Sequence, residues 1–380
     1  MDDETLALMR LLAAGGRGAP RRALLQAHGG AAAALDAGAH AWRAAGLDRA
    51  QRAALAAGAP ASLAPWRRWL EAAPGRHLLG FGQPAYPALL ARLPAPPLGL
   101  WVEGDPGLLW HPGIAVVGSR AATPGGLRNA AAFAGAFARA GFAVTSGLAA
   151  GIDAAAHAGA LEVPGGRTVA VLGTAIDQPW PRSNVALHAR IVERGVVASE
   201  VPPGVAYGAG AFPSRNRIVM GLSLGVLVVE AAARSGAAIT ARLAGDAGRE
   251  VFAIPGSIHN PKARGCHRLI RDGAALVETP GEVVEALAPL ALSLGDALRG
   301  RLGAPIEGAE AGPGGPVDRE PPADPDHQRL WKALDHDPTD MDTLVSRTGL
   351  TAAELGSMLL LMELEGRVVV EHGRYSRMSQ

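Results

Sequence analysis

The stretch Ile114-Ala115-Val116-Val117-Gly118-Ser119-Arg120 decides the fold that we expect for this chain. Consecutive apolar residues, β-branched ones among them, are typical of a parallel strand that is buried on both faces. A glycine loop at 121–126 and a predicted helix at 127–140 follow. This order of strand, glycine loop and helix favours an anion where the loop meets the helix. Gly118, Ser119 and Arg120 are therefore candidate binding residues.

The same alternation of strand and helix continues to about residue 288. Further apolar strands are predicted at 142–145, 168–172, 196–199, 225–229 and 251–254. The pattern predicts an α/β fold with a Rossmann-like, doubly wound, mostly parallel sheet, which binds ligands at the carboxyl ends of its strands. Segments 77–79 and 98–103 are predicted as two strands at the edge of this sheet.

The chain divides into four predicted parts. Residues 1–76 form a small helical domain, 77–294 the extended Rossmann-like domain, 295–325 a flexible linker rich in Gly and Pro, and 326–380 a compact tail domain. In the first part, the glycines of Gly15-Gly16-Arg17-Gly18 separate two short helices. They are compatible with phosphate binding by backbone amides, but we favour a simple helical turn.

The tail has the pattern of a winged helix. Helices are predicted at 328–334, 341–348 and 351–364, followed by strands at 367–371 and around Tyr375. Winged helices often bind duplex DNA, but from Asp324 onward acidic residues outnumber basic ones by 10 to 6. Because binding to phosphate requires cations, we favour a contact with protein or self-association for this domain.

Composition limits the functions that are open to the chain. The formal net charge of +1 predicts that any polyanion site is local. The single cysteine, Cys266, excludes an internal disulfide and fits a reducing compartment. The acidic first residues lack an apolar leader, and no apolar run has transmembrane length, so we expect a soluble, cytoplasmic protein. Cys266 and His267 lack the spacing of metal ligands, and no metal is expected.

The segment Phe212-Pro213-Ser214-Arg215-Asn216-Arg217-Ile218 supplies an aromatic ring, an amide and two arginines at the start of a predicted helix. With Arg120 there are three guanidinium groups that could share one pocket. Phosphate pairs with guanidinium, and Phe212 could stack on a base. These parts suit single-stranded nucleic acid, or equally a mononucleotide. Alternatively, an arginine pairs with Glu200 or Glu230 and Phe212 belongs to the core.

No catalytic constellation stands out. Asp153 and His157 lie one helical turn apart, and we expect a buried pair that fixes a loop rather than an acid–base pair. Ser235-Gly236 opens a helix after another strand, and Glu230 is expected to orient an arginine or hold a ribose hydroxyl. The chain lacks the ATP-binding motif G-x-x-x-x-G-K-[ST] and the dinucleotide motif G-x-G-x-x-G, so no cofactor is expected.

These motifs together resemble the DNA-processing protein A family (DprA, also called Smf), and the resemblance extends over nearly the whole chain. The matching runs are Val116–Arg120, Ser146–Asp153 with His157, Phe212–Ile218, Val229–Ala231 with Ser235, Gly236 and Thr240, and Pro255-Gly256.

The resemblance implies a single-stranded DNA-binding protein, without catalysis, that forms a homodimer through its Rossmann-like domain. It also implies loading of the RecA recombinase onto incoming strands during natural transformation. The N-terminal part would be the family's sterile-alpha-motif-like domain and the tail its winged helix. Carried over by position, the DNA pocket would be lined by Gly118, Ser119, Arg120, Ser146, Gly147, Phe212, Arg215, Asn216 and Arg217, and oriented by Asp153, His157, Glu230, Ser235 and Gly236.

The sequence departs from the family at two places. Many members have a lysine or arginine shortly before the Phe-Pro motif, whereas residues 205–211 contain none. Gly125 also stands where relatives tend to have tyrosine. The first departure implies either lower affinity or a basic residue supplied from elsewhere.

Two other functions remain as alternatives. A nucleotide-processing enzyme of the lysine-decarboxylase-like phosphoribohydrolase type would need a glutamate on the helix after its glycines. Here Glu230 precedes Ser235-Gly236, and the helix continues with Ile239 and Thr240, which argues against that enzyme. An interaction scaffold built on the winged helix would leave the arginines unexplained.

Overall fold

The computed structural model describes residues 2–206, 211–233, 235–302, 325–334, 339–351, 355–356, 358–359, 362, 368–371 and 374–377. The chain divides into two compact units, Met1–Ala304 and Pro305–Gln380, and each is described by itself. Among the described helices, none combines the length and the apolar composition that a bilayer crossing requires.

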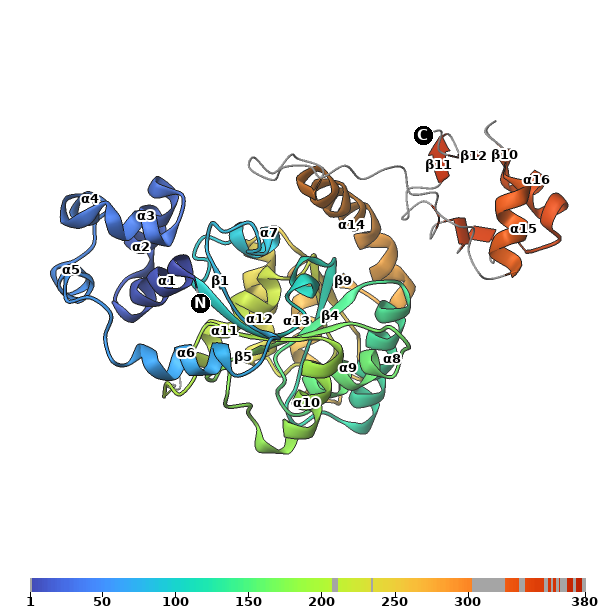
Figure 1. Cartoon of the computed structure of the whole chain (residues 1–380). Coiled ribbons are helices and arrows are strands. Elements are labelled where there is room, and N and C mark those ends of the chain that lie inside the picture. Colours follow the sequence, from blue (N-terminus) through green and yellow to red (C-terminus); the bar gives the residue numbers. More distant parts are fainter. Residues whose placement is uncertain are drawn as a thin grey trace. The chain divides into compact units, whose positions relative to one another are not determined.

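A nine-stranded sheet forms the centre of the first unit (Figure 1). Its spatial order is β1-β2-β6-β5-β4-β3-β7-β8-β9, and β3 to β9 pair in parallel, whereas β1 with β2 and β2 with β6 are antiparallel. The strands are β1 Arg76–Gly80, β2 Gly99–Gly104, β3 Gly113–Val117, β4 Ala143–Ser146, β5 Thr168–Leu172, β6 Val196–Ser199, β7 Gly225–Val228, β8 Glu250–Ala253 and β9 Ala275–Leu276. The predicted doubly wound sheet is confirmed, and the two early strands lie at its edge.

The apolar run at the centre of the sheet explains why β3 is buried on both faces. Ile114 and Val116 pack on one face, and Ala115 and Val117 on the other, because side chains alternate along a strand. The helices of this region are α7 Ala88–Ala91, η1 Pro106–Trp110, α8 Pro124–Arg139, α9 Ile152–Leu161, η2 Arg182–Asn184, α10 Val185–Arg194, α11 Ala211–Gly221, α12 Gly236–Asp246, α13 Arg264–Arg271 and α14 Pro280–Leu302.

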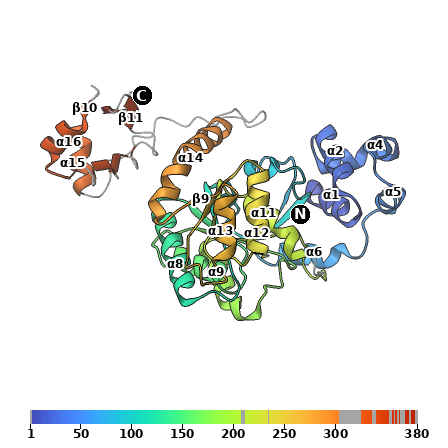
Figure 2. The ribbon, with the colours of Figure 1, turned by 180° about the vertical axis from the view of Figure 1, so that it is seen from behind.

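These helices cover the two faces of the sheet in separate layers. The core on one face includes side chains of α11, α12 and α13, and the core on the other includes side chains of α8, α9 and α14. Figure 2 shows α12 and α13 side by side on their face of the sheet. Both faces are thus covered, as the uninterrupted apolar strands predict.

Six short helices precede the sheet: α1 Asp3–Ala13, α2 Gly18–His28, α3 Ala31–Asp36, α4 Gly38–Ala44, α5 Arg49–Ala56 and α6 Leu63–Glu71. The sequence pattern did not predict α3 and α4, because helices this short are stabilised by packing and carry little periodicity. The rings of Trp66 and Trp69 pack edge-on against Trp101 of β2, with centroids 5.5 and 5.9 Å apart. This aromatic contact joins the helices to the sheet.

The glycine turn between α1 and α2 is bound from inside the protein. Gly15 and Gly16 have positive φ angles of 64° and 67°. The Gln51 amide donates to the Gly15 carbonyl at 2.8 Å, and the buried Arg21 guanidinium donates to the Gly16 carbonyl at 3.0 Å. The Gly15 amide also donates to the Leu12 carbonyl at 3.1 Å, as expected for the simple helical turn.

The predicted linker differs from the structure at its start. Helix α14 continues to Leu302, into the segment 295–325 that we predicted to be flexible. Its composition of Leu, Ala and Arg near residue 300 favours helix, although glycines occur close by. Residues 303–324 lie outside the described residues.

The second unit is a winged helix with its own apolar core. Its described elements are α15 Pro325–Ala333, β10 Thr339–Asp340, α16 Met341–Thr348, β11 Val368–Glu371 and β12 Arg374–Arg377. The strands form a sheet in the order β10-β12-β11. Leu330, Leu344, Leu359 and Val368 are buried together. Much of the predicted third helix, 351–364, lies outside the described residues.

Candidate nucleic-acid interface

A pocket of about 260 Å³ lies where the carboxyl ends of β3 and β7 meet the starts of α11 and α12. Strand β3 is flanked by β4 on one side and β7 on the other, so the chain reverses direction across the sheet at this point. Doubly wound sheets bind ligands at such a point. The lining includes Gly118, Ser119, Arg120, Asp153, Phe212, Pro213, Arg215, Asn216, Ser235, Gly236, Ile239 and Thr240.

Arg120 and Phe212 are in contact with each other in the lining of this pocket. The Arg120 side chain is exposed, and its guanidinium carbon lies 5.6 Å from the centroid of the Phe212 ring. This is a cation–π contact between a loop and a helix that are about 90 positions apart in sequence. A guanidinium beside an aromatic ring can bind a phosphate and stack on a base.

Arg215 is buried and acts as a brace. Its Nη1 donates to the Gly147 carbonyl at 2.5 Å and to the Val171 carbonyl, so α11 is tied to the ends of β4 and β5. Burial lowers the pKa of Arg215, and the neighbouring Asp153 carboxylate opposes that shift. Its buried Nε has no hydrogen-bond partner among the described residues.

Asp153 fixes the glycine loop that follows β4. Its Oδ2 accepts hydrogen bonds from the amides of Gly147 at 3.1 Å and Ala149 at 3.4 Å. Burial raises the pKa of this carboxyl, while Arg215 and the two amides favour its charged form. The carboxylate thereby holds the Gly147 carbonyl in reach of Arg215.

The predicted Asp153–His157 pair is wrong. His157 is fully buried, and its Nδ1 lies 2.7 Å from Thr168 Oγ1 instead. Since the Thr168 hydroxyl donates to the Val144 carbonyl, Nδ1 carries the proton and Nε2 is an acceptor without a partner among the described residues. Burial lowers the pKa of His157 to about 3, so the ring is neutral at physiological pH.

Glu230 binds Thr123 and not an arginine. Its carboxylate accepts from the Thr123 amide at 2.9 Å and from the Thr123 hydroxyl at 2.5 Å. Thr123 in turn caps the amide of Gly126 at the start of α8. Glu230 therefore fixes the loop after Arg120, which corrects the expectation that it orients an arginine.

Three predicted binding residues do not line the pocket. One is Gly147, whose carbonyl accepts the hydrogen bond from Arg215. Ser146 is completely buried, and its hydroxyl donates to the Val116 carbonyl at 2.6 Å, which cross-links β4 to β3. Arg217 pairs with Glu200 and donates to the Ala95 carbonyl at 2.8 Å. Of the three arginines expected in the pocket, only Arg120 and Arg215 line it, because the Arg217 side chain extends from α11 toward Glu200.

Ser235, Gly236 and Asn216 build the wall formed by α12. The Ser235 hydroxyl accepts from the Ala238 amide at 3.2 Å and caps the helix. The Asn216 amide group donates to the Gly236 carbonyl at 3.3 Å. These contacts bring the two helix starts together at the pocket, as the sequence predicted.

One cation near the pocket was missed by the sequence analysis. The Lys262 ammonium donates to the carbonyl of Ala121, the residue after Arg120. Because 141 positions separate the two residues, no local pattern joined them. The segment before Phe212 that lacks a basic residue lies mostly outside the described residues, at 207–210. Within the described part of the chain, no cluster of His, Cys, Asp and Glu has the composition of a metal site.

Comparison with known proteins identifies similar chains over most of this length. The family model for DNA recombination-mediator protein A matches residues 77–288, and that for the DprA winged helix domain matches residues 315–374. Protein Smf of Escherichia coli is 40% identical over 311 residues, which is 82% of this chain and 79% of that protein. The DNA processing protein DprA of Streptococcus pneumoniae is 43% identical over 199 residues, or 52% of this chain and 70% of that protein.

Two solved structures are similar in fold. The X-ray structure of DprA from Streptococcus pneumoniae has a TM-score of 0.65 at 32% identity and covers 75% of this chain and 98% of its own. That of DNA processing protein A from Helicobacter pylori, described for its single-stranded DNA binding mode, has a TM-score of 0.51 at 27% identity. It covers 56% of this chain and 96% of its own.

Gly147→Ala should displace the Arg215 brace. A Cβ atom at this position would lie 2.1 Å from Arg215 Nη1, and the buried guanidinium has little room to move. We expect a loss of about 1–3 kcal/mol in the free energy of unfolding, measured with urea. Gly125→Ala is the matched control, because its Cβ would meet nothing closer than 3.7 Å. Equal losses of unfolding free energy in the two variants would contradict the bracing role of Arg215.

His157 should make stability depend on pH. The folded-state pKa of about 3 lies below the unfolded value near 6.5, so the unfolded chain takes up the proton first as pH falls. Stability is therefore lost below about pH 6.5, by about 2 kcal/mol between pH 8 and pH 5 from this group alone. His157→Asn keeps a donor near the Nδ1 position without titrating, and the difference in pH dependence between the two proteins measures the contribution. A wild-type curve parallel to that of the variant would rule it out.

Proposed function

The chain belongs to the DNA recombination-mediator protein A family, and on that premise we propose that it binds single-stranded DNA at the Arg120–Phe212 pocket. One observation carries the proposal: the exposed Arg120 guanidinium lies over the half-buried Phe212 ring at the carboxyl edge of the sheet. The buried Arg215 adds positive charge behind them. Phosphate and base are the two chemical features of a strand that this pair would contact.

The carboxylates near the pocket support binding over catalysis. Asp153 is bound to backbone amides, and both oxygens of Glu230 are bound to Thr123. Helix α12, which follows the capping Ser235, presents Ile239 and Thr240 to the pocket and no early glutamate. This arrangement argues against the phosphoribohydrolase alternative, which needs a carboxylate facing its nucleotide.

Arg120→Ala should weaken binding of an oligo-dT strand and reduce the slope of log affinity against log salt by about 0.7, the value for one lost phosphate contact. Phe212→Ala should cost about 1–3 kcal/mol through lost stacking, while Phe212→Trp should retain binding. Fluorescence anisotropy at several salt concentrations measures both, with duplex DNA of the same length alongside.

Arg139→Ala is the matched control for charge. Arg139 is exposed at the end of α8, far along the helix from the Arg120 loop, so its loss should leave the salt slope unchanged. If Arg120→Ala behaves like this control, the pocket is misplaced. If the intact chain releases ribose 5-phosphate from a nucleoside monophosphate, the enzyme alternative replaces the proposal.

We further propose that the chain acts in the cytoplasm as a homodimer that loads RecA onto single strands during natural transformation. Family membership supports this role. Support for self-association comes from exposed apolar side chains, Leu276 on the edge strand β9 and Leu290 and Leu292 on α14. The acidic balance of the winged helix supports a contact with protein for that domain.

RecA loading has a direct kinetic test. On single-stranded DNA already covered by single-strand-binding protein, the chain should shorten the lag before RecA begins to hydrolyse ATP. Arg120→Ala should restore the long lag, because loading depends on holding the strand. A chain that binds the strand normally but leaves the lag unchanged would be a DNA-binding protein without mediator activity.

A further inference from the structure

A second hollow, of about 550 Å³, adjoins the pocket on the far side of the start of α12. The two share one wall, which consists of Ser235, Gly236 and Ile239. Its volume lies in the range of roughly 300–1,000 Å³ that is usual for sites of small organic ligands. The proposed function makes no use of this hollow.

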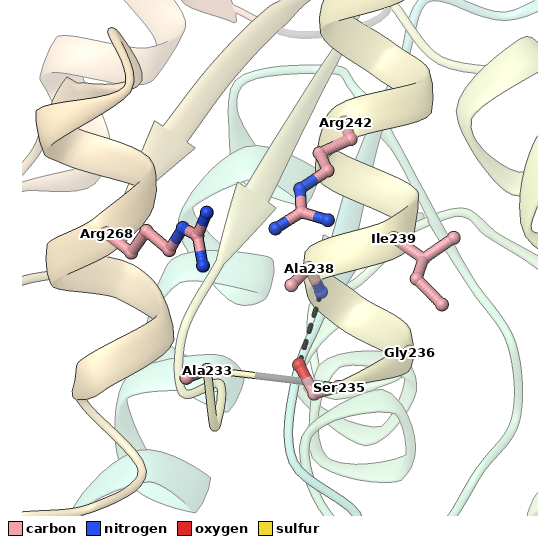
Figure 3. A pocket seen from close by; sticks show the side chains of 7 residues that line it. All are labelled: Ala233, Ser235, Gly236, Ala238, Ile239, Arg242 and Arg268. Atoms are coloured by element: carbon pink, nitrogen blue, oxygen red, sulfur yellow. Dashed lines mark hydrogen bonds between the residues drawn. The ribbon is translucent and has the colours of Figure 1, made fainter.

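Two arginines reach into the hollow from opposite sides. Arg242 comes from α12 and Arg268 from α13, and Figure 3 shows both guanidinium groups directed into the space above Ala233 and Ser235. Both side chains are exposed. The Nε of Arg268 lies 3.5 Å from Asp272, and Figure 3 shows its terminal nitrogens turned toward the hollow.

Because the guanidinium groups of Arg242 and Arg268 are both positively charged and extend into the same hollow, an anion between them would be attracted by both. Each guanidinium offers N–H groups in a planar fork that matches phosphate oxygens. The Asp272 carboxylate pairs with Arg268 through an exposed i, i+4 contact, which contributes little free energy. A phosphate in the hollow would thus contact the guanidinium groups of Arg242 and Arg268. It would also lie at the N-terminus of α12, which Ser235 caps.

The shared wall supplies an apolar surface between the two anion sites. Ile239 is 44% exposed, unusual for a large aliphatic side chain, and in Figure 3 it points away from the two arginines. Because it also lines the Arg120–Phe212 pocket, it lies where a strand would pass from one site to the other. An apolar side chain there can contact the face of a base while phosphates lie on either side.

Resting on the proposed function, we propose that the single strand continues over the Ser235–Ile239 wall and that Arg242 and Arg268 bind its sugar-phosphate backbone. The strand would first contact Arg120 and Phe212 and then cross Ile239. It would next reach Arg242 of α12 and Arg268 of α13. The ligand of the second hollow is a phosphodiester of the same strand, and each arginine reads charge without base specificity.

The test is the dependence of affinity on strand length. Oligo-dT strands from about 3 to 15 nucleotides are titrated into the full-length chain, wild type and the double variant Arg242→Gln/Arg268→Gln. The shortest strands should bind both proteins alike. Strands that are long enough to cross the wall should bind the double variant about tenfold more weakly at low salt, with a salt slope smaller by about 1.4 for two lost contacts.

Controls separate this proposal from the proposed function. Arg139→Gln/Arg264→Gln removes two exposed charges outside the hollow and should change neither length dependence nor slope. If Arg120→Ala weakens strands of every length while the Arg242/Arg268 double variant matches its control, only the continued path is wrong. If Arg120→Ala has no effect at any length, the proposed function itself fails.

A free nucleotide is the other source of the same chemistry. Calorimetric titration with dTMP distinguishes a free nucleotide from a strand. A separate mononucleotide site would give binding heat in the wild type and in Arg120→Ala, and none in the Arg242/Arg268 double variant. That result would overturn the continued path. Since all substituted side chains are exposed, the melting temperatures should remain within a few degrees and confirm folding.

Discussion

The candidate site depends on one buried guanidinium. Arg215 holds the carbonyls of Gly147 and Val171, so it fixes helix α11 against the ends of two neighbouring strands. A buried cation is costly unless acceptors and a nearby negative charge compensate it, and Asp153 supplies that charge. Gly147 has no side chain because the guanidinium occupies the space where a Cβ atom would lie. Removing the brace would leave Phe212 without a fixed position at the start of α11.

The carboxylates near the pocket are bound to groups of the surrounding loops. Glu230 caps the loop after Arg120 through Thr123, and Asp153 holds the loop after β4. Both negative charges act on backbone amides, where they favour the loop conformation and attract no substrate proton. The Arg120 guanidinium remains exposed in the lining, beside the half-buried Phe212 ring. A nearly neutral chain can in this way present a local site for a polyanion.

The loops around β3 also show how a binding edge is built from residues far apart in sequence. Gly151 adopts a positive φ of 81°, and a Cβ atom there would lie 2.2 Å from the Ser119 carbonyl. The loop after β4 thus packs directly against the loop that carries Arg120. On the other side, Lys262 contacts the Ala121 carbonyl. Three loops from different strands hold Arg120 in place, although only one contains it.

The sequence by itself determined the order of the strands in the chain, their burial and the edge where we propose that a ligand binds, because apolar runs and glycine loops are local signals. It also predicted Arg120, Phe212 and the helix start at Ser235 as neighbours, since carboxyl ends of parallel strands share an edge. Only the tertiary structure decided which polar groups pair. Arg217 binds Glu200, Ser146 binds the Val116 carbonyl and His157 binds Thr168, and each choice rests on distances and directions between separate elements. Hydrogen bonds and ion pairs depend on geometry within a few tenths of an ångström, which residue type and spacing along the chain do not encode.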